Sequence, residues 1–150
     1  LENFLSYLEV DPNNRITIEQ NRIIGTYYAS EVSYVYKDFG TDYFGTSFVH
    51  KFSTTLAGGT LSYPHYATVW ALSNSIGHAG TRIGGWLYPP YAQAVGCFLY
   101  RNSSLGSRIY IRDYEDGISD QDYVQILPNT PYYVTITRID DAVHMSVYID

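Results

Sequence analysis

Apolar and polar residues alternate with a period of two along much of the chain. Aromatic and β-branched residues take every second position most clearly over residues 108–112, 132–137 and 143–149. A period of two places successive side chains on opposite faces of a strand. The pattern therefore predicts half-buried antiparallel strands, each with one face on a core and the other in water.

Shorter alternating segments predict further strands, and turn residues separate them. These segments cover residues 15–19, 22–26, 33–39, 48–54, 93–101 and 123–126. Residues 67–72 are apolar on both faces and contain Trp70, which predicts a central strand, whereas residues 4–10 fit either a strand or a short helical turn. Strands at intervals of about 8–15 residues predict an all-β fold, a two-sheet antiparallel β-sandwich or jelly roll.

Length and composition fit one globular domain over residues 1–150. Leu, Ile, Val and Phe supply 39 of the 150 residues, enough for a core, and Tyr is unusually frequent with 17. Because the chain lacks an initiator Met and stops directly after a strand pattern, we expect it to be a segment of a longer protein or a processed form.

Charge and cysteine content exclude several classes of function. The net charge is −6 with only nine Lys and Arg residues, so we expect no nucleic-acid binding. No apolar run approaches the roughly 20 residues that span a bilayer, so we expect no membrane insertion. The single cysteine, Cys97, lies in an apolar run and is predicted to be a buried, inert thiol.

The strand-and-turn pattern resembles the concanavalin A-like and laminin G-like jelly-roll group. The resemblance lies in residues 123–138, a short strand, a turn, the pair Tyr132-Tyr133 and a long strand, followed by the strand over residues 143–150. Upstream, residues 34–40, 48–52 and 69–74 are similar to a branch found in environmental and phage-type proteins. The resemblance implies a jelly roll of two antiparallel sheets that binds glycan or protein at a sheet edge or rim loop.

Enzymatic chemistry has one candidate fragment. Glu9-Val10-Asp11 resembles the start of the Glu-x-Asp-x-x-Glu motif of laminarinase-type glycosidases, but Asn14 occupies the third acidic position. An amide cannot supply the proton that the general acid must donate. His50 shares a strand face with Phe48 and Phe52, which predicts a hydrogen-bonded core or interface histidine. We therefore expect no catalytic residues.

An acidic loop is predicted over residues 115–122. Five acids in and beside it form a candidate calcium site, because hard cations prefer several carboxylate and carbonyl oxygens on a flexible loop. These acids are Asp113, Glu115, Asp116, Asp120 and Asp122. A solvated acidic loop is the alternative interpretation, so no cofactor is required and calcium is the one cofactor considered.

Two groups of side chains are candidates for ligand binding. Residues 84–91 form an aromatic loop in which Trp86, Tyr88 and Tyr91 offer rings on a backbone stiffened by prolines, and sugars stack on such rings. The second group, Arg108, Tyr110 and Arg112, lies on the outward face of a strand, where arginines bind carboxylates of acidic sugars or of a protein. The alternatives are a cap on the core and a solvated strand face.

The leading hypothesis is a non-catalytic carbohydrate- or surface-recognition module of an extracellular or virion-associated protein. Its partner would be a carbohydrate, a cell surface or a protein. The second hypothesis is a structural subunit or decoration domain that self-associates through its aromatic surfaces. A glycoside hydrolase is the third.

Overall fold

The computed structural model describes residues 2–26, 33–40, 43–58, 65–73, 94–115 and 118–149. Within these ranges, the side chains of residues 65, 113–115 and 118–121 lie outside the description. The described residues form strands joined by turns, together with one short 3-10 helix.

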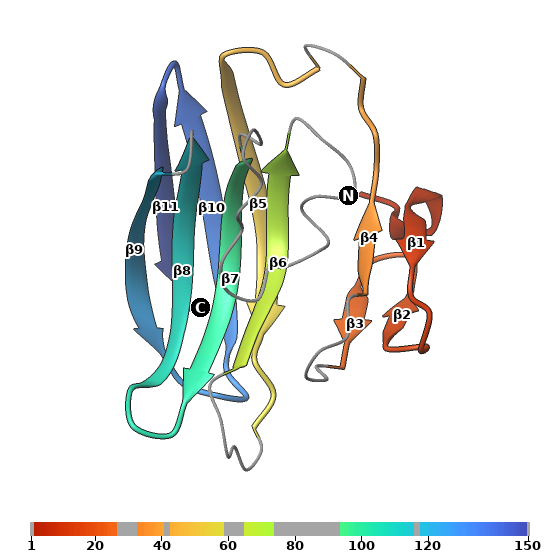
Figure 1. Cartoon of the computed structure of the whole chain (residues 1–150), viewed down its shortest axis with the longest axis vertical. Coiled ribbons are helices and arrows are strands. Elements are labelled where there is room, and N and C mark those ends of the chain that lie inside the picture. The colour runs from red at the N-terminus through yellow and green to blue at the C-terminus, as the bar shows by residue number, and fades with distance from the viewer. Residues whose placement is uncertain are drawn as a thin grey trace.

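The elements follow one another as a chain of antiparallel strands (Figure 1). They are the 3-10 helix η1 (Phe4–Ser6) and the strands β1 (Leu8–Val10), β2 (Ile16–Ile18), β3 (Ile23–Gly25), β4 (Tyr34–Tyr36), β5 (Ser47–Thr55), β6 (His65–Ser73), β7 (Ala94–Asn102), β8 (Gly106–Glu115), β9 (Ile118–Ile126), β10 (Pro131–Ile139) and β11 (Ala142–Tyr148). The prediction of an all-β antiparallel fold is therefore confirmed.

Two larger sheets face each other and give the molecule its sandwich-like character (Figure 1). One sheet has the strand order β6-β7-β8-β9, in which consecutive strands are neighbours. The other has the order β11-β10-β5, so that β10 pairs with a strand far away in the sequence. The chain passes from one sheet to the other between β5 and β6 and again between β9 and β10.

The core lies between these two sheets. Ile109 from one sheet and Ile136 from the other are completely buried. Strand β10 alternates between buried and partly exposed residues, as a period of two requires when one face meets the core. The buried cluster consists of Cys97, Leu99, Ile109, Ile126, Tyr132, Val134 and Ile136.

Cys97 lies within this core, as the sequence predicts. Its side chain has no solvent exposure, and its Sγ atom lies 3.9 Å from Sδ of Met145 in the opposite sheet. Burial in an apolar environment disfavours the thiolate and raises the pKa of the Cys97 thiol to about 12.

Strand β6 corrects one prediction. Residues 67–72 were expected to form a central strand, but β6 lies at the edge of its sheet. A register shift between Thr68 and Trp70 marks a β-bulge, which adds one residue to β6 relative to β7. Val69 and Trp70 both pack against the core as a result. The apolar run therefore reflects a bulge rather than burial on both faces.

The acidic segment also differs from its prediction. Residues 115–122 were expected to form a loop, but β8 extends to Glu115 and β9 begins at Ile118. The two strands pair over nine positions, including Asp113 opposite Asp120. The β-branched residues at Ile109 and Ile111 sustain the long strand to which this segment belongs.

Strands β1 to β4 form two small sheets beside the sandwich, on the side of β5 and β6 (Figure 1). Strand β1 pairs with β4, and β2 pairs with β3 in the hairpin predicted around Gln20-Asn21. Aromatic rings connect this part of the chain to the sandwich. The ring centroids of Phe39, just after β4, and Phe44 are 5.0 Å apart, and Phe44 in turn contacts Phe48 and His50 on β5 with ring centroids 5.6 and 5.1 Å apart.

His50 joins the two large sheets through a hydrogen bond. The indole N–H of Trp70 on β6 donates to Nδ1 of His50 on β5 over 2.9 Å. An acceptor at Nδ1 requires the neutral imidazole. Burial lowers the pKa of His50, with a smaller opposing effect from Glu2. The hydrogen bond predicted for this core or interface histidine is confirmed, and His50 is half-buried between the two sheets.

We expect the stability of the protein to fall as the pH drops below the ordinary histidine pKa of 6.5. The unfolded chain takes up a proton near that pH, whereas folded His50 resists it, so acid favours unfolding. Stability from this residue is complete above about pH 6.5 and is lost as the pH falls toward the lowered folded pKa. Urea unfolding between about pH 7.5 and 5.5 measures the slope.

The variant His50→Gln should show a shallower slope than the wild type over the same pH range. His144→Gln is the matched control, because the His144 side chain is exposed on β11 and should leave the slope unchanged. Equal slopes in the wild type and in His50→Gln would contradict the assignment of this pH dependence to His50.

Candidate functional site

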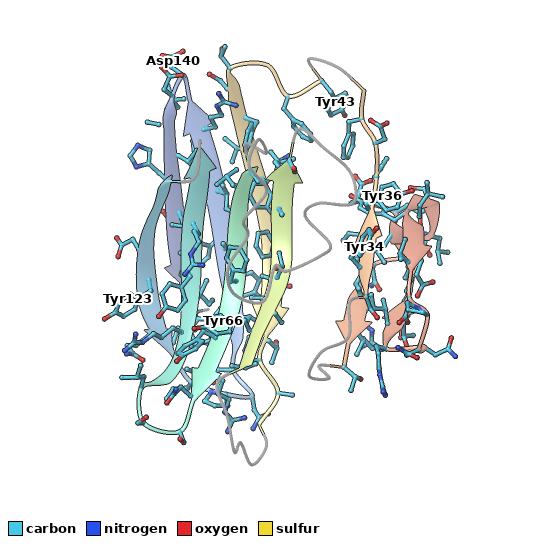
Figure 2. All side chains as sticks on the ribbon, in the orientation of Figure 1. Tyr34, Tyr36, Tyr43, Tyr66, Tyr123 and Asp140 are labelled. Carbon is cyan, nitrogen blue, oxygen red and sulfur yellow. The ribbon has the colours of Figure 1, made fainter. Side chains whose placement is uncertain are left out.

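A row of tyrosines and arginines crosses the outer face of the four-stranded sheet. We call this surface the tyrosine–arginine face. Figure 2 shows two of its members, Tyr66 and Tyr123, on the same side of the sheet. The face consists of Tyr66 on β6, Phe98 and Tyr100 on β7, Arg108, Tyr110 and Arg112 on β8, and Tyr123 and Gln125 on β9.

The strand register places these side chains together. Residues directly opposite each other in an antiparallel pair share a face. Tyr66 pairs with Tyr100, Tyr110 pairs with Tyr123, and Arg108 pairs with Gln125. Since Ile109 between them points into the core, alternation directs its neighbours Arg108 and Tyr110 outward.

The tyrosine rings form a ladder across the sheet. The ring centroids of Tyr66 and Tyr100 are 4.5 Å apart, those of Tyr100 and Tyr110 are 5.7 Å apart, and those of Tyr110 and Tyr123 are 5.3 Å apart. Tyr100, in the middle, is almost fully buried, whereas Tyr123 on the edge strand is 45% exposed. The ladder is thus packed at its centre and open at the β9 end.

Arg108 lies at the open end and is held by three side chains. Its guanidinium carbon lies 4.2 Å from the centroid of the Tyr123 ring, and Nη1 donates a hydrogen bond to the Tyr110 hydroxyl over 3.1 Å. In the amide orientation that satisfies both groups, Nε donates to the Gln125 side-chain oxygen over 3.1 Å. These contacts fix a side chain that otherwise has many rotamers.

A second arginine lies nearer the other end of the face. The guanidinium carbon of Arg112 is 5.8 Å from the centroid of the Phe98 ring. Phe98 itself folds back over Gly96, because a Cβ atom added to Gly96 would lie 2.8 Å from two carbons of that ring. Gly96 therefore leaves the space that the Phe98 ring occupies, and Arg112 lies over that ring.

The environment of the face raises the pKa values of Arg108 and Tyr66. The hydrogen bond from Arg108 to Tyr110 raises the pKa of Arg108. Desolvation, followed by the interaction with Tyr100, raises the pKa of Tyr66. At neutral pH the face therefore offers guanidinium donors beside hydroxyl groups that donate and accept hydrogen bonds.

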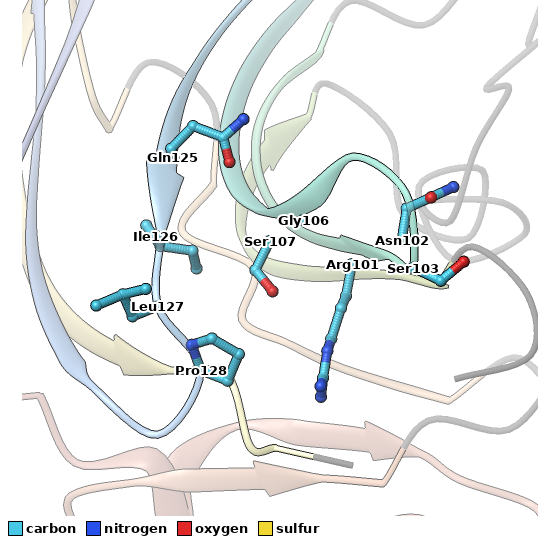
Figure 3. Close-up of a pocket in the computed structure, with 9 residues that line it drawn as sticks. All are labelled: Arg101, Asn102, Ser103, Gly106, Ser107, Gln125, Ile126, Leu127 and Pro128. Atoms are coloured by element: carbon cyan, nitrogen blue, oxygen red, sulfur yellow. The ribbon is translucent and has the colours of Figure 1, made fainter. Parts of the chain in front are cut away.

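An open hollow of about 570 Å³ adjoins this surface at the end of the β7–β8 hairpin (Figure 3). It is bounded by the hairpin turn, the end of β9 and Pro128, and Gln125 is common to the hollow and the tyrosine–arginine face. Two of its polar side chains serve the fold: Arg101 donates to the Ala57 carbonyl over 3.1 Å, and Asn102 accepts from the Ser104 backbone over 2.7 Å. The hollow can extend a binding surface but brings no reactive group with it.

The predicted residues Arg108, Tyr110 and Arg112 lie on one outward face, as expected. The sequence reasoning did not select Tyr66, Tyr100 or Tyr123, although each alternates with residues that face the core. For Tyr123 the signal was present in its alternation with Val124 and Ile126. Three other candidates, Trp86, Tyr88 and Tyr91, lie outside the described residues.

The proposed calcium ligands are described only in part. Asp113, Glu115, Asp120 and Asp122 follow the β8–β9 hairpin in their backbone, and Asp116 lies outside the described residues. The Asp122 carboxylate accepts a hydrogen bond from the Tyr123 backbone N–H over 2.7 Å. Among side chains that the structure describes, no group of three or more His, Cys, Asp or Glu could hold a metal ion. The calcium site stays a prediction.

The fragment that resembles a glycosidase motif has a local structural role at Asp11. Its carboxylate accepts hydrogen bonds from the Ile16 backbone and from the Ser33 hydroxyl, both over 2.7 Å. Desolvation alone would raise the pKa of Asp11, but hydrogen bonds led by that from the Arg15 backbone lower it. Asp11 thus connects the turn before β2 to the segment that leads into β4.

Comparison of the chain with protein-family models, curated proteins and solved structures finds no match to any of them. In the described part of the chain, no helix has the length and apolar character needed to cross a membrane.

Proposed function

We propose that this protein is a non-catalytic carbohydrate-recognition module that binds glycan on the tyrosine–arginine face. The observation that carries the proposal is the tyrosine ladder, which ends at an exposed ring, Tyr123, beside the fixed guanidinium of Arg108. Sugars present apolar C–H faces to aromatic rings and hydroxyl groups to polar side chains, and this end of the ladder offers both kinds of partner.

The opposite outer surface differs in character and supports the choice of face. On the three-stranded sheet, exposed side chains such as Lys51, Ser53 and Ser146 are mostly small or charged. Its aromatic pair, Tyr133 and Tyr148, is stacked with ring centroids 5.7 Å apart. On the four-stranded sheet, by contrast, arginines lie over aromatic rings.

We expect Tyr123→Ala to weaken glycan binding by about three- to tenfold, because the variant loses a stacking ring. A glycan array identifies the ligand, and isothermal titration calorimetry of the best hit measures the change. Tyr148→Ala is the matched control, since Tyr148 is 48% exposed on the outer face of the other sheet and should not affect binding. Equal losses in both variants would contradict binding on the tyrosine–arginine face.

The second candidate is an assembly subunit that packs against copies of itself through aromatic surfaces. The stacked pair of half-buried Tyr133 and exposed Tyr148 favours this function. If the protein is an assembly subunit, we expect a blank array, and oligomers in sedimentation velocity that dissociate in the variant Tyr148→Ala.

We also propose that the two large sheets belong to a concanavalin A-like jelly roll. This proposal rests on the sequence resemblance and on the two passages of the chain between the sheets.

A further inference from the structure

Arg108 has a positive charge that no carboxylate neutralises within the described part of the chain. The ion pairs found there join Glu19 to Arg22 and Glu2 to Lys37, far from β8 in the sequence. The groups that raise the pKa of Arg108 are the phenols of Tyr110, Tyr123 and Tyr100, and the hydrogen bond to Tyr110 has the largest effect. In a protein with a net charge of −6, this guanidinium is a local site of attraction for an anion.

Among the described residues, the hydrogen bonds of Arg108 leave one guanidinium nitrogen unused. Nε and Nη1 have partners in Gln125 and Tyr110, while Nη2 has none among the described residues. The ring of Tyr123 supports the guanidinium plane from one side. A guanidinium held in this way loses little further conformational entropy when it binds an anion, so its hydrogen bonds contribute more fully to affinity.

The same geometry disfavours a purely neutral ligand at this position. Because Arg108 covers one face of the Tyr123 ring, part of the stacking surface is already occupied. The open end of the ladder therefore presents a charged guanidinium, a fork of N–H donors, that lies over an aromatic ring. Carboxylate and sulfate groups match that fork, since each can accept two parallel hydrogen bonds.

An acidic peptide fits the site less well than an acidic sugar. A peptide would gain most by adding a strand to the β9 edge. The N–H of Tyr123 at that edge already donates to the Asp122 carboxylate, so it is not available to pair with an added strand. A sugar instead needs hydroxyl and amide partners on the sheet face, which Tyr110 and Gln125 provide.

We infer that the glycan bound on the tyrosine–arginine face carries a negative charge, a carboxylate or a sulfate, that pairs with Arg108. This inference rests on the proposed function and specifies its ligand class. The site does not distinguish a carboxylate from a sulfate by chemistry, so the test includes both.

The test uses the full chain on an array of neutral oligosaccharides, uronic-acid oligosaccharides and sulfated oligosaccharides. We expect hits among the anionic probes, and calorimetry of the best hit should show a loss of at least about tenfold in Arg108→Gln. Arg108→Lys should lose part of the affinity, because the charge remains and the fork is gone. Added salt should weaken binding in the wild type more than in Arg108→Gln.

Lys51→Gln is the control for net charge, because it removes one positive charge from the exposed outer face of the other sheet and should bind as the wild type does. Thermal unfolding of each variant separates loss of binding from loss of folding. Hits confined to neutral sugars, or anionic hits that Arg108→Gln leaves unchanged, would overturn the inference but keep the proposed function. A blank array would overturn both the inference and the proposed function. If the array is blank and an oligoglutamate peptide binds, the site is assigned to an acidic protein partner.

Discussion

Ile136→Ala is expected to lower the free energy of unfolding by about 2–5 kcal/mol, because it removes three carbon atoms from the centre of the core and leaves a cavity. Ile136 has no solvent exposure and lies on the central strand of its sheet, between β11 and β5. Neighbouring strands on both sides hold the backbone in place, so the cavity has little freedom to collapse. Urea unfolding monitored by tryptophan fluorescence measures the change.

Ile139→Ala is the matched control on the same strand. Ile139 is 57% exposed, so the same substitution should change stability by less than about 1 kcal/mol. Similar losses at both positions would mean that Ile136 is not buried between the two sheets as described, and the sandwich-like core would have to be reconsidered.

Gly96→Ala is expected to destabilise the protein by about 1–3 kcal/mol through overpacking, although alanine normally favours a strand over glycine. The added Cβ atom would lie 2.8 Å from the Phe98 ring, which must then leave its position. Phe98 is itself almost fully buried and supports Arg112, so its displacement disturbs the tyrosine–arginine face as well as the fold.

Gly25→Ala is the control for the change of residue type. Gly25 also lies in a strand, and no atom would approach its added Cβ within 4 Å, so we expect a neutral or slightly stabilising effect.

Combining Gly96→Ala with Phe98→Leu should recover part of the lost stability, because the smaller side chain can move aside. Denaturant unfolding of Gly96→Ala, Phe98→Leu, the double variant and Gly25→Ala tests this. Additive losses in the double variant would indicate that the contact between Gly96 and Phe98 is not the cause.

The regular strands could be predicted because their pattern comes from one buried face. Over residues 132–137 the alternation of Tyr132, Val134 and Ile136 with polar residues matches the burial of β10. Prediction failed where local pattern and tertiary context differ. The bulge at Val69 mimics a fully buried strand, and a hairpin with acidic residues resembles a loop when cross-strand pairing is unknown.

The candidate site was found only in part for a similar reason. Arg108, Tyr110 and Arg112 could be selected together because they share one strand and one face. The ladder also needs Tyr66 and Tyr123 on other strands, and only the register brings these rings within contact of their partners. Since register depends on turns and on the packing of whole sheets, a single sequence does not specify it at the level of individual pairs.

The burial of Cys97 protects its thiol from oxidation and from disulfide exchange. Its sulfur is enclosed by the core next to Met145, and its raised pKa leaves almost no thiolate to attack an oxidant or a disulfide. As the single cysteine of the chain, it also has no internal partner with which to form a cross-link. The Cys97 thiol therefore stays reduced in oxidising as well as in reducing surroundings while the chain is folded.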